Sequence, residues 1–414
     1  MNELVVGNRG GDEIIERLNN AGYEAYYVGG CVRNAVLGLK IKDYDITTSA
    51  KPEEVISLFA DCKVFETGLK HGTVTILTDM PYEVTTFRKE GKYSDSRHPD
   101  KVFFCSSLNA DLERRDFTCN AMAFSKKQGI IDNFNGLYDT RNHILRAVGV
   151  PVSRFKEDPL RILRGVRFAS EFGFSIEDRT ARAMRTCGNL LDKVSRERVY
   201  SELKRIIEGE HFYDAVIDFA DLLFIGLQTE RVEKNYADAV TAVASCDGDF
   251  YTRFAVFLYI VFNGDLEKSI EIINKMRSEN ILKIKVKRCF LSIFILLSDL
   301  DYFKSDNALQ KYTVKKIMKN CDGDTDTFIS FLQAVSVVRS MPYLDRVKRL
   351  TEEIVENNEC YQIGDLAING NDVVECGFSG RRISETMNNV LDLVMRGTLR
   401  NSKNDLLEYI KGLV

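Results

Sequence analysis

The sequence predicts an α+β protein in which an N-terminal head with a mixed sheet precedes an all-helical remainder. Over the first ~125 residues, short β-like runs alternate with turns and two helical stretches. After about residue 150, apolar residues recur at i, i+3 and i+4 almost to the end, which is typical of amphipathic helices. A length of 414 residues suffices for two or more domains.

The head should contain two helices and five strands. The first helix covers Ile14–Ala21, and the second begins at Pro52, where proline and the following acids favour a helix N-terminus. The turn at 78–81 should join two strands as a hairpin. The strand candidates are Tyr26–Val28, Tyr44–Thr47, Val74–Thr78, Tyr82–Phe87 and Val102–Cys105.

The helical remainder shows neither an internal repeat nor a low-complexity tract. Two apolar runs, Phe254–Phe262 and Cys289–Leu297, are too short to span a bilayer and should form buried helices. Earlier helices are expected at Leu160–Glu171, Ile176–Asn189, Arg196–Glu208 and Asp214–Ala220.

Composition points to a soluble protein of the reducing cytoplasm. The opening residues lack the basic and apolar pattern of a signal peptide, and the ten cysteines form no CxxC pair, so neither zinc nor disulfides are indicated. The net charge is −4, but two segments are basic. Residues 141–210 carry 15 Lys/Arg and 10 Asp/Glu, and residues 275–350 carry 15 Lys/Arg and 8 Asp/Glu. Solvated helix faces explain such segments most simply, and a nucleic-acid partner is the alternative.

The first chemical motif combines Gly29, Gly30 and Arg33 with Asp43 and Asp45. The glycine turn follows a strand and lets backbone N–H groups approach a phosphate. Two aspartates spaced i, i+2 in a strand place both carboxylates on one face, where they can hold Mg²⁺. An isolated DxD is usually a solvated turn, but at this spacing from the glycines it predicts a site for a nucleoside triphosphate and its metals.

Glu83 could supply a third carboxylate from a neighbouring strand, although a surface glutamate is an equal alternative. Three acidic groups around two Mg²⁺ ions suit in-line phosphoryl transfer, in which one metal activates an attacking hydroxyl and the other neutralises the departing pyrophosphate. No protein nucleophile is then required. The four histidines are scattered, so no histidine metal cluster is indicated.

The second motif is the run Arg114-Arg115-Asp116-Phe117-Thr118-Cys119-Asn120-Ala121. Adjacent arginines could clamp phosphate or ribose while Asp116 fixes the orientation of an arginine. A helix-start ion cluster capped by Asp116 or Thr118 explains the same run, and it is the simpler interpretation of the motif alone.

The third motif runs from Glu157-Asp158-Pro159 to Arg161, Arg164 and Arg167. The arginines recur every three residues and form one ridge, while Leu160, Leu163 and Phe168 should pack in the core. Such a ridge is usually a solvated face. Because it begins beside two acids after a catalytic head, a base- and phosphate-reading helix is a serious alternative.

Asp158 and Arg161 suit a particular pair of bases. Asp158 only accepts hydrogen bonds and Arg161 only donates them. Cytosine and adenine each present an amino donor beside a ring-nitrogen acceptor, whereas uracil and guanine present the opposite order. Mispaired buried polar groups are costly, so this pair predicts selection of C and A over U and G.

Together these motifs resemble those of bacterial class II tRNA nucleotidyltransferases, the CCA-adding enzymes of the polymerase β superfamily. Further similar segments are Tyr93-Ser94-Asp95-Ser96-Arg97-His98-Pro99, Val194-Ser195-Arg196-Glu197-Arg198-Val199, Gly364-Asp365-Leu366-Ala367-Ile368-Asn369-Gly370 and Leu399-Arg400-Asn401. The resemblance therefore spans most of the chain. It implies template-independent addition of C, C and A to tRNA from CTP and ATP, with two Mg²⁺ ions.

The resemblance also implies a domain plan: a nucleotidyltransferase head at 1–150, a neck with the template motif at 151–210, a helical body at 211–300 and a tRNA-binding tail at 301–414. The helical part would bind the acceptor–TΨC half of tRNA through its backbone, and no protein partner is evident. The implied catalytic and metal ligands are Asp43 and Asp45. The implied nucleotide contacts are Gly29, Gly30, Arg33, Arg114, Arg115, Asp116, Asn120, Asp158, Arg161, Arg164 and Arg167.

Two positions depart from the family pattern. Asn34 stands where the family usually has Asp, which questions a contact to Arg33. The segment Asp132-Asn133-Phe134-Asn135-Gly136 stands where Asp-Pro-Phe-Gly-Gly is frequent, which questions the turn geometry.

Other functions share these motifs. An A-adding enzyme paired with a separate CC-adding one stays open, although the loop from Arg88 to Pro99, which CC-only enzymes lack, favours competence for A. A poly(A) polymerase, a catalytically inactive RNA-binding module and a metal-dependent phosphohydrolase are less favoured. The retained aspartate pair argues against the inactive module, and the lack of an adjacent His-Asp pair argues against the phosphohydrolase.

Overall fold

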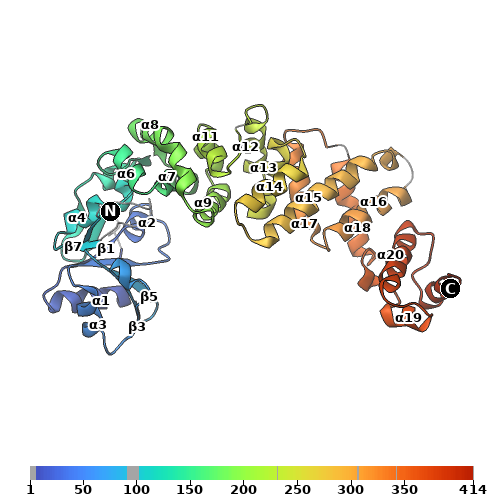
Figure 1. Ribbon diagram of the computed structural model, residues 1–414, viewed down its shortest axis with the longest axis horizontal. Helices are drawn as coiled ribbons and strands as arrows, with labels where there is room; N and C mark the ends of the chain where they lie inside the picture. Colours follow the sequence, from blue (N-terminus) through green and yellow to red (C-terminus); the bar gives the residue numbers. More distant parts are fainter. Residues whose placement is uncertain (1–5, 91–101, 231, 305–306, 342, 414) are drawn as a thin grey trace. The chain divides into compact units, whose positions relative to one another are not determined.

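The computed structural model describes residues 6–90, 102–230, 232–304, 307–341 and 343–413. The chain forms two compact units, residues 1–231 and 232–414, each of which can be followed along the colour bar of Figure 1. The division into head, neck, body and tail stays a prediction. The candidate loop segment 91–99 lies outside the described residues.

A mixed sheet forms the head, as predicted, but it has seven strands, and those at 63–65, 122–125 and 129–132 were not among the candidates. Its strand order is β3-β4-β5-β2-β1-β8-β9; β2 and β5 run parallel and the other pairs are antiparallel. The strands are β1 Ala25–Val28, β2 Asp45–Thr48, β3 Lys63–Phe65, β4 Thr73–Leu77, β5 Pro81–Thr86, β8 Met122–Ser125 and β9 Gly129–Asp132. The expected hairpin joins β4 to β5. The predicted strand at 102–105 is β7 (Val102–Phe104), which pairs with β6 (Arg88–Glu90) outside this sheet.

Both faces of the sheet are buried. Tyr27 on β1 packs in one core with Ile14 and Leu18, whereas its neighbour Tyr26 packs in another with Phe87. Successive strand residues point to opposite faces, so β1 contributes to both cores. The helices of the head are α1 Arg9–Asn20, α2 Gly30–Val36, α3 Pro52–Leu58, α4 Leu108–Glu113 and α5 Gly136–Arg141 (Figure 1), with the short 3-10 turns η1 Leu69–His71 and η2 Thr118–Asn120.

Helices complete the first unit, with a small addition to the all-α expectation: β10 (Ile144–Leu145) pairs with β11 (Ser175–Ile176). The helices are α6 Pro151–Glu157, α7 Leu160–Phe172, α8 Asp178–Cys187, α9 Arg196–Glu208, α10 Phe212–Val216 and α11 Ala220–Gly226. The single helix predicted at 214–220 is wrong, because α10 ends at Val216 and α11 begins at Ala220, with Phe219 as its N-cap. Ala215 and Phe219 are nevertheless both buried, so two short helices satisfy the apolar spacing that suggested one.

The second unit is helical throughout its described residues. Its helices are α12 Tyr236–Ala244, α13 Phe250–Val261, α14 Leu266–Lys275, α15 Asn280–Ser298, α16 Asn307–Asn320, α17 Thr325–Ser336, α18 Leu344–Glu356, α19 Gly370–Glu375, α20 Arg381–Arg396 and α21 Lys403–Lys411. Among the described residues, no helix is both long and apolar enough to cross a membrane.

The two apolar runs differ in their burial. The run on α13 is buried, as predicted. The prediction is wrong for one face of α15, where Phe294 is 67% exposed and Leu291 and Leu297 are exposed as well. A continuous apolar run cannot indicate which sides of a helix other elements cover.

Candidate nucleotide-binding site

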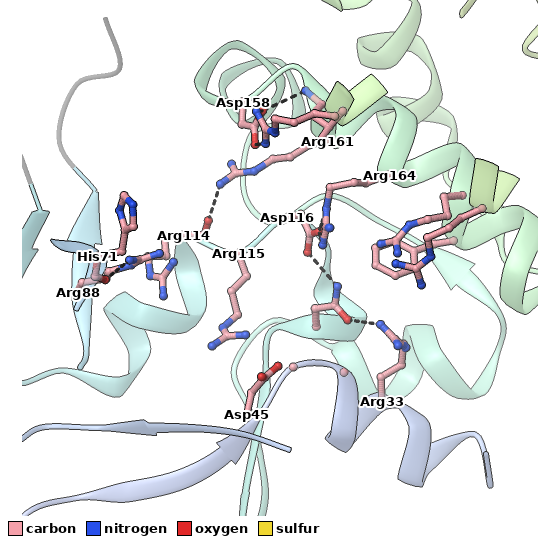
Figure 2. Close-up of a pocket in the computed structure, with 18 residues that line it drawn as sticks. Arg33, Asp45, His71, Arg88, Arg114, Arg115, Asp116, Asp158, Arg161 and Arg164 are labelled. Atoms are coloured by element: carbon pink, nitrogen blue, oxygen red, sulfur yellow. Dashed lines mark hydrogen bonds and ion pairs between the residues drawn. The ribbon is translucent and has the colours of Figure 1, made fainter. Parts of the chain in front are cut away.

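A pocket of about 770 Å³ in the first unit gathers nearly all the predicted site residues. Figure 2 shows Asp45 and Arg115 pointing toward one another on one side, with Asp158 and Arg161 on another. All the predicted nucleotide-binding residues line the pocket, and of the predicted metal ligands Asp45 does. The lining residues that were not predicted for the site are His71, Arg88, Leu160, Phe168, Arg198 and Arg205.

The lining is strongly cationic. It contains nine arginines and three aspartates. Several guanidinium groups around one concave surface favour a polyanion, because each can donate charge-assisted hydrogen bonds to phosphate oxygens. The pocket can therefore accept a triphosphate.

Gly29 allows the side chain of Arg115 to lie close to the backbone at one side of the pocket. Its φ of 71° lies in the left-handed region, and a Cβ there would lie 2.9 Å from Arg115 Nη1 and 3.8 Å from Asp45 Oδ2. A side chain would therefore be strained and would displace Arg115. The glycine also leads directly into α2, which carries Arg33.

Asp45 begins β2 at the edge of the pocket. Its register partner on the parallel strand β5 is Glu83, so the two carboxylates belong to adjacent strands. Burial raises the pKa of Asp45, the charge of Arg115 lowers it, and the carboxylates of Glu83 and Asp43 raise it; the net pKa lies above the ordinary value of 3.8. Asp45 thus carries a negative charge that its surroundings only partly balance.

Asp43 differs from the prediction in one respect. It lies in the exposed segment before β2, so the two aspartates do not share a strand. Among the described residues, no three His, Cys, Asp or Glu side chains are gathered closely enough to hold a metal ion. The donor chemistry nevertheless fits Mg²⁺, because Asp43 and Glu83 both act electrostatically on the half-buried Asp45 carboxylate.

Asp116 lies in the pocket lining and pairs with Arg164, which is 48 residues away in the sequence. Arg164 Nε and Nη2 donate to Asp116 Oδ2 at 2.9 and 2.6 Å. Asn120 Nδ2 donates to Asp116 Oδ1 at 3.0 Å, and Asn120 Oδ1 accepts from Arg33 Nη1 at 2.6 Å. Burial would raise the pKa of Asp116, but the charge of Arg164 and the hydrogen bonds from Asn120 and Arg164 hold it well below its usual range.

The neighbouring arginines are held by an acid that the sequence analysis missed. Arg114 and Arg115 form ion pairs with the fully buried Asp111 on α4, at 2.8 and 3.3 Å. A local signal existed, since Asp111 precedes the two arginines by three and four positions. Arg114 and Arg115 therefore line the pocket as a pair that is held by Asp111, whereas Asp116 pairs with Arg164.

The α7 ridge faces the pocket and is not a solvated face. Arg161 and Arg167 are only 8% and 3% exposed, and all three ridge arginines line the pocket. Phe168 and Leu160 are buried as predicted, but they line the pocket too. The guanidinium carbons of Arg33 and Arg167 lie 5.1 and 4.5 Å from the centre of the Phe168 ring, an arrangement typical of cation–π contacts.

Asp158 and Arg161 lie at one end of this ridge, and each has a partner of opposite charge. Asp158 Oδ2 accepts from Arg198 Nη2 at 2.9 Å, and Oδ1 accepts from the backbone N–H of Leu160 at 3.1 Å. Arg161 Nη1 donates to Glu157 Oε2 at 2.8 Å. Arg198 lies within a segment noted for its family resemblance but was given no role from sequence.

The two departures from the family pattern have clear structural outcomes. Asn34 Oδ1 accepts from Arg33 Nε and Nη2 at 3.2 and 2.9 Å, so the questioned contact is present. In the 132–136 turn, Asp132 Oδ1 accepts from the backbone N–H of Gly136 at 2.8 Å, and Asn135 adopts φ 60°, which asparagine tolerates. The turn is thus held without the proline.

Two family models match the first unit. One is described as a poly A polymerase head domain and covers residues 25–146; the other is described as a probable RNA and SrmB-binding site of polymerase A and covers residues 173–222.

Similar proteins extend the likeness over the whole chain. The chain is 34% identical over 405 residues to the CCA-adding enzyme of Lactobacillus helveticus, covering 97% of this chain and 96% of that protein. It is 51% identical over 199 residues to the CCA-adding enzyme of Lactiplantibacillus plantarum, which is 48% of each chain. The crystal structure of the Bacillus stearothermophilus CCA-adding enzyme in complex with CTP matches with a TM-score of 0.73 and 27% identity, covering 97% and 96% of the two chains. This chain belongs to the family of CCA-adding enzymes, which are tRNA nucleotidyltransferases.

Proposed function

We propose that this protein adds C, C and A to the 3′ end of tRNA, using CTP and ATP and releasing pyrophosphate. One observation carries the proposal: a single pocket places the half-buried Asp45, a cationic lining and the Asp158/Arg161 pair together. The names of its full-length relatives favour CCA addition over poly(A) synthesis or addition of A alone. Solved structures of similar fold include complexes with ATP, with CTP and with tRNA. We also place the enzyme in the cytoplasm, which suits its ten free cysteines.

The arginines of the pocket would bind and align the triphosphate. Arg115 lies beside Gly29, where a phosphate can approach the backbone closely, and Asp111 fixes the orientation of its guanidinium. Arg164 is fixed in the same way by Asp116. Phosphoryl transfer depends mainly on positioning and electrostatic stabilisation, so arginines with restricted orientations are well suited to it.

The metal ligands would be Asp43 and Asp45, with Glu83 as a third carboxylate. The unbalanced charge of Asp45 between an arginine and two carboxylates supports this assignment. Two Mg²⁺ ions held there would neutralise the triphosphate and the departing pyrophosphate and would acidify the 3′ hydroxyl of the tRNA. The protein residues themselves need no nucleophile; they hold the reacting oxygens in line.

Asp158 and Arg161 would read the incoming base. Asp158 accepts three N–H groups within the described structure, from Leu160 and from both terminal nitrogens of Arg198. A carboxylate has about four acceptor positions, so one remains for the amino group of cytosine or adenine. Arg161 would donate to the neighbouring ring nitrogen.

Replacing either template residue should relax base selection. We expect Asp158→Ala or Arg161→Ala to lower the preference for CTP and ATP over UTP and GTP by about 10- to 100-fold, because mispaired groups are no longer penalised. The measurement is extension of tRNA that ends at the discriminator base, with each nucleotide singly and in mixtures. Product lengths on one gel also separate CCA, CC, A and poly(A) addition. An unchanged preference in both variants would contradict the template role.

Binding of tRNA should weaken with salt. We expect affinity to fall about 100-fold when the salt concentration rises about fourfold, because backbone contacts release counterions. The lysines of α16 should contribute little, since Lys311, Lys315 and Lys316 already form ion pairs with Glu353, Glu359 and Asp299. The measurement is tRNA affinity by filter binding at several salt concentrations. The Lys311→Ala protein is the control, and we expect its affinity to change with salt concentration as steeply as that of the unaltered protein. A tRNA affinity of the unaltered protein that does not change with salt concentration would contradict recognition of tRNA through its phosphate backbone.

A further inference from the structure

We propose that Arg198 is a positioning residue that fixes the Asp158 carboxylate so that only one order of base donors and acceptors is recognised. This inference rests on the proposed base-reading role of Asp158.

The orientation of the Asp158 carboxylate requires support from other side chains or backbone groups. Asp158 lies between α6 and α7 with an extended backbone (φ −136°, ψ 100°). Its backbone N–H donates to the carbonyl of Arg154 on α6 and its carbonyl accepts from the N–H of Arg161 on α7, but these bonds do not fix the rotation of its side chain. The backbone N–H of Leu160 holds Oδ1 from the same short link. Arg198 reaches the other oxygen, Oδ2, from α9, and the two side chains remain 24% and 16% exposed toward the pocket.

Arg198 forms one of a series of ion pairs that α9 makes with α7 and with the link that precedes α7. Arg167 pairs with Glu202 at 2.9 Å, and Arg205 pairs with Glu171 at 2.7 Å. These pairs hold α9 against the arginine ridge. The Arg198–Asp158 pair, at 2.9 Å, is the one in this series that reaches the proposed base-reading residue.

The orientation of Asp158 matters because its presence alone does not discriminate among the bases. Uracil and guanine also carry ring N–H donors, and a carboxylate free to rotate would accept from those as readily as from the amino groups of cytosine and adenine. Selection therefore depends on an acceptor held at a fixed place relative to the Arg161 donor. A guanidinium fork that engages the carboxylate supplies that restraint, whereas a lysine supplies charge without the planar fork.

The test is base selection by Arg198 variants of the full-length protein. We measure kcat and KM for CTP, UTP, ATP and GTP with three tRNA substrates. These end at the discriminator base, after the first added C and after the second added C. We expect Arg198→Ala to lower the CTP/UTP and ATP/GTP ratios of kcat/KM about tenfold, mainly through faster incorporation of UTP and GTP. The Arg198→Lys protein should give kcat/KM ratios between those of the unaltered protein and those of Arg198→Ala. Combining Arg198→Ala with Asp158→Ala should select no worse than Asp158→Ala alone, because Arg198 acts through Asp158.

Arg179→Ala is the matched control, since it removes the same charge from an exposed position on α8 that does not line the pocket. We expect it to retain the selection ratios. An equal loss of selection in Arg179→Ala, or unchanged selection in a folded Arg198→Ala protein, would overturn the proposal. If Arg198→Ala does not fold, Arg198→Lys decides by the same ratios. A failure of the unaltered enzyme to prefer C and A would overturn the proposed function as well, so the two failures are distinguishable.

Discussion

Asp45→Asn is expected to lower nucleotide incorporation by about a thousandfold or more, since it removes a charged oxygen ligand from the proposed metal site. The same change should leave the melting temperature unchanged or raise it. Asp45 is half-buried, its pKa is raised, and within the described residues no side-chain hydrogen bond or ion pair engages its carboxylate. Loss of activity without loss of stability is the pattern expected of a residue kept for function.

The measurements are single-turnover extension of tRNA and thermal unfolding in metal-free buffer. Glu53→Gln is the matched control, because it removes one exposed carboxylate from α3, and neither property should change. Asp43→Asn should lower incorporation in the same direction as Asp45→Asn. Full activity of Asp45→Asn would refute the metal assignment, and a lower melting temperature would show that the carboxylate has a structural partner.

Asp116→Asn is expected to impair both folding and activity. An uncharged amide leaves Arg164 without its main counter-charge and disturbs the hydrogen bond from Asn120, which in turn orients Arg33. Breaking a buried ion pair costs about 3 kcal/mol in the free energy of unfolding. We expect the cost for Asp116→Asn to be no higher than this. Arg164 is partly exposed, and Glu202 at 4.0 Å remains as a second carboxylate near it. Denaturant unfolding measures this cost.

The contribution of Asp116 should also depend on pH in a defined direction. Its folded-state pKa is lowered, so its stabilising effect is fully present above the ordinary Asp pKa of about 3.9 and is lost as the pH falls below that value. The difference in stability between the unaltered protein and Asp116→Asn should therefore shrink as the pH falls below 4. Asp61→Asn, at an exposed ion pair with Arg17 that also lowers the pKa of Asp61, should show a much weaker trend because solvent screens this pair. A constant difference down to the lowest pH at which the protein folds would contradict the buried pair as its cause.

Local patterns indicated the parts of this protein that local geometry controls. Alternation and turn residues located the strands of the head, and a three-residue repeat placed Arg161, Arg164 and Arg167 on one ridge. The glycine turn and Asp45 were identifiable because a backbone that approaches phosphate requires Gly29 at its positive φ. Burial could not be read in the same way: the apolar run on α15 leaves Phe294 exposed, whereas the arginine ridge is largely covered.

The partners of the charged side chains were decided by tertiary structure alone. The sequence by itself predicted the α+β class, which the structure confirms. It also identified the glycine turn, Asp45, Asp158 and Arg161, whose roles toward a triphosphate, metals and a base stay predictions. Only the folded chain assigned Asp116 to Arg164 and Asp158 to Arg198, across 48 and 40 residues. Helix and strand periodicities act over a few residues and are therefore visible in the sequence. Ion pairs between distant elements depend on how α7 packs against α9 and on how it approaches the segment that carries Asp116, which no local spacing encodes.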